Sequence, residues 1–172
     1  FGCKTNKTSK ELERFSLYTT IEELDTISGS IVVVPKIDRY IFLPKELSLY
    51  QKIDNLLDSI TIYSFNSLSI EILDLDINEQ GYKRLKVNLK EFPGFTIPNS
   101  LGRKYQTWYD YFQGSTGGRH TTIVLIESIL QTDYMGDWIN ELEFYYQNEK
   151  IGEWDHTSLS ETVIREYHNS PL

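Results

Sequence analysis

The order of apolar patterns between residues 47 and 152 constrains the fold of this chain more than any single motif. Apolar side chains first recur at helical spacing, then alternate with polar ones on either side of a turn at residues 78–81, and return to helical spacing beyond residue 121. These patterns predict an amphipathic helix, a hairpin with one buried face, a second helix and a last strand. The first helix carries Leu49, Ile53, Leu56, Leu57 and Ile60 on its inner side.

Two details refine this prediction. Pro44 lies just ahead of the first helix, where proline is well tolerated. A slip in the alternation at Leu73 and Asp74 predicts a bulge in the hairpin. With 172 residues, of which 40% are hydrophobic, the chain can bury one domain-sized core. We therefore expect a single α+β domain with a small mixed or antiparallel sheet and two helices packed on one face.

The predicted domain runs from residue 30 to residue 172. Residues 1–29 are polar and are predicted to form a tether with a short helical patch at Glu11, Leu12 and Phe15. Residues 31–34 and 40–42 are predicted to be two short strands of a hairpin. The tail beyond Gly152 is predicted to dock on the domain as a helix capped by Ser158 or Ser160.

The charge balance restricts the classes of partner. The chain carries 17 basic and 25 acidic residues, a formal net charge of -8. This excess of negative charge repels the phosphates of nucleic acid and of anionic membranes. No run is long and apolar enough to cross a bilayer. We expect neither nucleic acid nor a cofactor, and contact with a membrane only through a lipid on Cys3.

Cys3 is the single cysteine of the sequence, so no disulfide forms within the chain. Phe1, Gly2 and Cys3, with the polar residues behind them, resemble the end of a bacterial lipoprotein signal peptide and its tether. An ordinary cysteine near an arbitrary chain boundary explains the same residues. If the resemblance holds, Cys3 is the lipidated residue and the protein is a membrane-anchored, extracytoplasmic lipoprotein.

Residues 31–152 resemble a GerMN domain, a module of sporulation and spore-germination proteins that is also found in bacterial lipoproteins. The matching features are the helix at 49–60, the strand pair at 70–92, the glycine-serine segment at 114–118, the helix at 121–131 and the segment at 139–150. The chain departs from the family pattern at residues 128–131, by an aromatic insertion at 95–112 and by a turn at 148–150 that lacks the family's usual glycine. The resemblance implies a noncatalytic interaction or assembly module of the cell envelope that binds an envelope protein or a second copy of itself.

A hydrolase is the alternative from another functional class. It would use Ser115 as nucleophile and His120 as base, with Asp110, Asp133 or Asp137 orienting the imidazole. Thr116 could replace Ser115. No nucleophile-elbow phrase accompanies these residues, so we expect no catalytic residues.

Residues 114–118 are glycine-rich and precede a helix, where backbone amides can bind an anion, but a flexible connection is the favoured interpretation. Asp74, Asp76 and Asn78 have the spacing that opens a calcium loop. Glu79 and Leu85 replace the glycine and the closing glutamate that such a loop needs, so we expect no metal site.

An aromatic segment is the remaining candidate for ligand recognition. Its candidate binding residues are Arg103, Tyr105, Trp108, Tyr109 and Tyr111. Aromatic rings beside basic groups can stack on a sugar, a peptide or a protein surface. The same rings can also fold over the core with the tyrosine hydroxyl groups in water, and this is the favoured interpretation.

Overall fold

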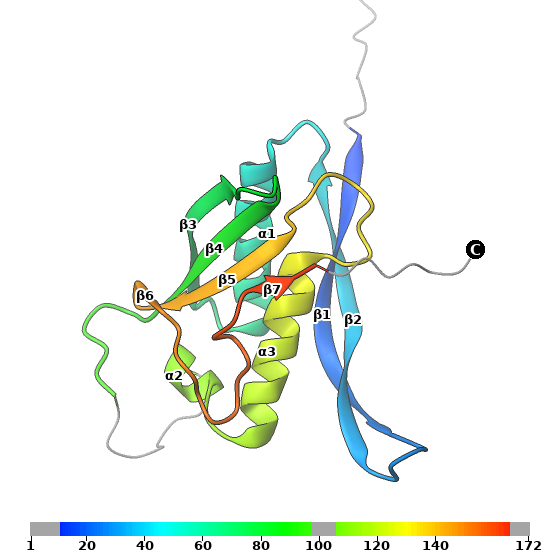
Figure 1. Ribbon diagram of the computed structural model, residues 1–172, viewed down its shortest axis with the longest axis vertical. Helices are drawn as coiled ribbons and strands as arrows, with labels where there is room; N and C mark the ends of the chain where they lie inside the picture. Colours follow the sequence, from blue (N-terminus) through cyan, green and yellow to red (C-terminus); the bar gives the residue numbers. More distant parts are fainter. Residues whose placement is uncertain (1–10, 98–105, 166–172) are drawn as a thin grey trace, which may run out of the picture.

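The computed structural model describes residues 11–97 and 106–165. A five-stranded sheet forms one layer, the helices α1 (Leu49–Ser64) and α3 (Ser115–Leu130) pack on one face of it, and a two-stranded ribbon crosses the far side of α3 (Figure 1). This arrangement confirms the predicted α+β class and the helices on one face of a small sheet.

The sheet is mixed. Its strands follow the order β3 (Ser69–Ile77), β4 (Lys83–Lys90), β5 (Glu141–Tyr146) and β6 (Glu149–Lys150), and β7 (Val163–Ile164) also pairs with β5. Strands β4 and β5 run parallel, and the other pairs are antiparallel. The β3–β4 hairpin has its register shift between Ile72 and Asp74, where the sequence predicted a bulge.

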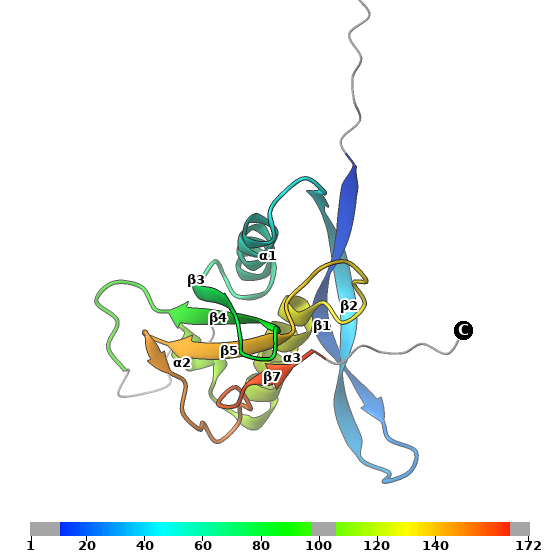
Figure 2. The ribbon, with the colours of Figure 1, turned by 45° about the horizontal axis from the view of Figure 1, so that its top comes forward.

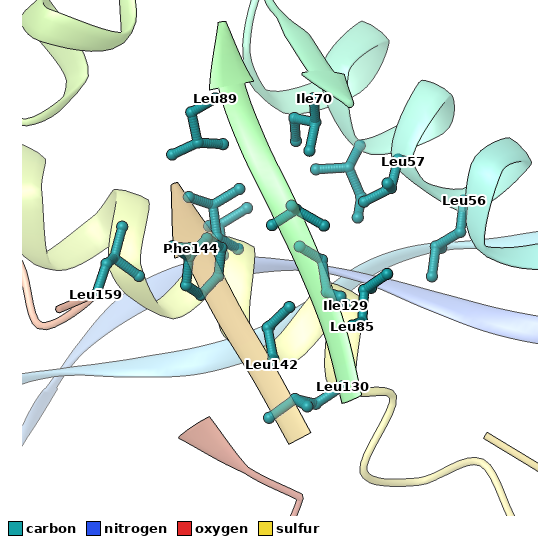
Figure 3. Close-up of a cluster of buried hydrophobic side chains, with 14 of the residues drawn as sticks. Leu56, Leu57, Ile70, Leu85, Leu89, Ile129, Leu130, Leu142, Phe144 and Leu159 are labelled. Carbon is teal, nitrogen blue, oxygen red and sulfur yellow. The ribbon is translucent and has the colours of Figure 1, made fainter. Parts of the chain in front are cut away.

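Helix α1 forms where the apolar spacing predicts it. Ser48 caps its first turn, and the side chain of Gln51 completes a capping box by accepting a hydrogen bond from the Ser48 backbone. Its inner residues pack against the sheet, where the buried side chains of β4, β5 and α3 join them (Figure 3). The labelled members of this core include Leu56, Leu57, Leu85, Leu142 and Phe144.

The expectation for the N-terminal part is wrong over residues 12–24. Instead of a tether with a helical patch, β1 (Leu12–Leu24) pairs along its whole length with β2 (Ile31–Pro44). Strand β2 is also continuous, although the sequence predicted two short strands there. Phe15 and Leu17 are fully buried because β1 lies on α3, and the local sequence gives no sign of that distant contact.

The glycine-rich segment is also different from the prediction. Residues 115–118 are the first turn of α3, so they do not form a flexible loop. A side chain at position 118 would collide with the backbone of His156, so the close approach of the tail requires Gly118. The predicted C-terminal helix is absent from the described residues up to Arg165, where the chain instead forms β7 and buries Leu159. No helix of the described residues is long and apolar enough to span a membrane.

Candidate functional site

The outer edge of β1 is covered by polar side chains of α3. The Ser16 amide donates to Oε1 of Gln131 at 2.8 Å, and Nε2 of Gln131 donates to the Ser16 carbonyl at 2.7 Å. Two residues further along the strand, the Tyr18 amide donates to Oγ of Ser128 at 2.9 Å. Side chains of a helix thus make the hydrogen bonds that a neighbouring strand would otherwise make.

The geometry of Gln131 suits this task. It caps α3 in the left-handed conformation, with φ of 50°, and its Nε2 also donates to the Ser128 carbonyl at 2.5 Å. Both Gln131 and Ser128 are almost completely buried. The sequence did not predict either residue as a bonding partner of the strand, and the signal it offered was two polar residues beside the apolar positions of α3.

His120 belongs to the same interface between α3 and β1, and it precedes Ser128 in the helix. Its Nδ1 lies 2.6 Å from Oγ1 of Thr20, so one hydrogen bond joins α3 to the next outward-facing part of β1. Burial lowers the pKa of His120 below the ordinary histidine value. The imidazole is therefore neutral at pH 7, and it contributes a hydrogen-bonding group without a positive charge.

A pocket of about 500 Å³ opens where α3 begins and the ribbon continues beyond it. Its walls come from both strands of the ribbon, from the end of α2 (Trp108–Tyr111) and from the first two turns of α3. Its lining includes Thr20, Ile21, Glu22, Val33, Thr116 and His120. This volume lies within the range of small-molecule binding pockets.

The hydrolase residues do not come together. Ser115 and His120 are five positions apart in α3, which places them on different sides of the helix, whereas Thr116 lies one turn from His120 and lines the pocket with it. No hydrogen bond joins either hydroxyl to the imidazole among the bonds of the described residues.

The three candidate orienting acids are occupied elsewhere. Asp133 accepts a hydrogen bond from the Tyr18 hydroxyl, Asp137 pairs with Lys83, and Asp110 accepts from the Gln106 amide at the start of α2. The partner that His120 has instead is Thr20, a neutral hydroxyl. The described geometry therefore offers no nucleophile, base and acid in mutual contact.

The aromatic candidates lie mainly in the core. Trp108 is fully buried and its indole N–H donates to the Ser69 carbonyl at 3.0 Å, and Tyr111 is also buried. The rings of these two residues therefore cannot present a stacking surface, which corrects that expectation for both. Tyr109 is half-buried, with its ring 5.6 Å from that of Trp154. Arg103, Tyr105 and the proposed lipidation residue Cys3 lie outside the described residues.

Strand β4 supplies a basic partner for the acidic residues that resembled a calcium loop. Nζ of Lys86 lies 3.0 Å from Asp74 and 3.3 Å from Asp76, and these contacts hold the pKa of Asp74 below its usual value. The lysine takes the place beside these carboxylates that a cation would need. Within residues 11–97 and 106–165, no group of histidine, cysteine and acidic side chains is arranged to hold a metal ion.

The far end of the ribbon extends past the rest of the described chain in both views (Figures 1 and 2). Its turn is ordered by Asp25, whose carboxylate accepts from the Ile27 amide at 3.0 Å and from the Ser28 hydroxyl at 2.6 Å. Ile27 is nevertheless 96% exposed, and Leu24 and Ile31 beside it are more than half exposed. We call these three residues the apolar tip.

Comparison of the chain with family models, with curated proteins and with solved structures gives no match. The resemblance to the GerMN domain therefore remains a prediction from the sequence.

Proposed function

We propose that this protein is a noncatalytic interaction module that binds a protein partner through the projecting end of the β1–β2 ribbon. The observation that carries this proposal is the apolar tip, in which Leu24, Ile27 and Ile31 are exposed on a turn that Asp25 holds in place. Exposed apolar groups gathered on an ordered projection gain free energy when a partner covers them. The tip thus has the chemistry of a docking surface.

The proposal includes a location in the bacterial cell envelope. The residues around Cys3 and the GerMN-like order of elements support an extracytoplasmic lipoprotein, attached to the membrane only through a lipid on that cysteine. The net charge of -8 supports a protein partner over nucleic acid. The partner is then an envelope protein or a second copy of this chain.

Site-specific photo-cross-linking in the native cells tests the docking surface. A photoreactive amino acid replaces Ile27 at the tip, and the control carries it at Ile62, an isoleucine on α1 that is also exposed (61%). We expect a discrete cross-linked protein from position 27 and none from position 62. Equal yields from both positions, or no adduct from position 27, would refute the proposal.

The location has a separate test. The protein is isolated from its native cells, and its intact mass is measured together with its distribution between membrane and soluble fractions. A chain that begins at a diacylated Cys3 in the membrane fraction is the expected result. An unmodified soluble chain would overturn the lipoprotein assignment and leave the docking surface to be judged by cross-linking alone.

A further inference from the structure

We propose that the outer edge of β1 at residues 20–24, with the pocket beside it, binds an extended peptide segment of the partner as an added strand. An apolar side chain of that segment enters the pocket, and basic residues flank it. This inference rests on the proposed function, because it names the mode of binding and the chemistry of the partner for the same ribbon.

The backbone groups of β1 at residues 20, 22 and 24 point to its outer edge. Along a strand, the amide and carbonyl of every second residue point to the same edge. Ser16 turns both groups and Tyr18 its amide toward side chains of α3, so the groups of Thr20, Glu22 and Leu24 point to that edge as well.

The side chains of α3 cover only part of the outer edge of β1. Helix α3 begins at Ser115, and its last side-chain bond to β1 in this direction is the contact of His120 with Thr20. Within the described part of the chain, no group outside the ribbon bonds the backbone of Glu22 or Leu24. Unpaired strand edges of this kind are where proteins add a strand from a partner.

The pocket lies against residues 20–22 of β1. Thr20, Ile21 and Glu22 all line it, although consecutive side chains of a strand point to opposite faces. Val33 of β2, the cross-strand partner of Glu22, lines it too, so the pocket lies against the face that Thr20, Glu22 and Val33 share and reaches the edge of β1 at Ile21. An added strand at this edge places one of its side chains directly over the pocket, as in other cases of strand addition.

The polarity and charge of the pocket and its rim determine which peptide they can bind. Val33, the cross-strand partner of Glu22, gives the lining an apolar side chain, and His120 is neutral, so an uncharged apolar side chain fits. Glu22 and the neighbouring exposed Glu23 give the rim a negative charge, within a chain of net charge -8. Lysine or arginine beside the apolar residue complements this rim, whereas a second copy of the acidic chain would add repulsion.

The test uses a library of random peptides displayed on phage and selected on the full-length protein. The affinity of each selected peptide is then measured by fluorescence anisotropy for the natural chain and for two variants. Thr116→Phe fills the pocket, and Ser115→Phe makes the same addition at the neighbouring exposed residue, which does not line it. Both changes lie in the first turn of α3, so their effects on folding are comparable.

We expect selected peptides with an apolar residue between basic ones, and a loss of affinity of about tenfold or more in Thr116→Phe but less than about twofold in Ser115→Phe. Glu22→Pro, which removes one outward amide from an edge where proline is tolerated, should weaken the same peptides, with thermal melting as the check on folding. Peptides that bind Thr116→Phe as well as the natural chain, or a selection that yields no binder, would overturn the inference.

This outcome is distinguishable from failure of the proposed function. If position 27 still cross-links a partner in cells while Thr116→Phe binds every peptide normally, the ribbon is a docking surface but the partner does not add a strand at this edge. If position 27 gives no adduct, the proposed function fails independently of the peptide result. A cross-linked product with twice the mass of the chain would identify a second copy as the partner and would refute the basic segment.

Discussion

Gln131→Ala is the change that most directly tests the attachment of the ribbon to α3. In the natural chain the amide of Gln131 satisfies both the N–H and the carbonyl of Ser16, a residue only 7% exposed. Alanine leaves both backbone groups buried without a partner. Each such group costs about 1–3 kcal/mol, so the free energy of unfolding should fall by about 2–6 kcal/mol.

Urea denaturation measures this loss. With a slope of about 2 kcal/mol/M, typical of a small domain, the midpoint should fall by about 1–3 M while the slope itself stays unchanged. The matched control is Gln147→Ala. Gln147 has φ of 52°, close to the 50° of Gln131, but it is exposed and its side chain makes no hydrogen bond among the bonds of the described residues.

The control isolates the hydrogen bonds, because both variants make the same chemical change in the same left-handed conformation. Gln147→Ala should alter the free energy of unfolding by no more than about 0.5 kcal/mol, as exposed substitutions usually do. If Gln131→Ala is as stable as Gln147→Ala, the side-chain bonds do not hold β1, and the account of its covered edge is wrong.

Three further predictions concern buried groups. Trp108→Ala should lower the free energy of unfolding by about 3–5 kcal/mol in urea denaturation, because the ring is fully buried; unchanged stability would return Trp108 to the candidate binding surface. Burial raises the pKa of Glu91, so its contribution to stability is present at acidic pH and is lost as the pH rises through the folded-state pKa; Glu91→Gln should remove that decline from a series of melting temperatures, and an identical pH profile would contradict this. Burial lowers the pKa of His120, so the unfolded chain takes up this proton first and stability falls as the pH drops below the ordinary histidine range; an NMR titration of the imidazole should give a pKa below that range, and an ordinary value would refute the burial.

The elements that the sequence predicted are those whose pattern is local. The spacing of Ile53, Leu56 and Ile60 is enough for α1, because one helix face meets the core every three or four residues. The alternation around residues 70–89 is enough for the β3–β4 hairpin, and the slip at Leu73 for its bulge. Neighbouring residues supply all of this information.

The remaining elements depend on contacts between distant residues. The pattern of residues 12–24 does not identify a strand, because its partner β2 lies beyond a turn and its other edge is satisfied by Gln131, which is 115 residues away from Ser16. The parallel pairing of β4 with β5 likewise joins segments separated by two helices.

The candidate site follows the same division. The sequence singled out His120 only in the alternative hydrolase hypothesis, beside Ser115, and it offered Trp108 both as a candidate binding residue and as part of the core. Only the packing of α3 against the ribbon pairs His120 with Thr20 and leaves a pocket beside an uncovered strand edge. The sequence thus determined the local elements through their periodicity, whereas the tertiary structure decided which edges and side chains remain open, because that depends on where distant elements stop covering one another.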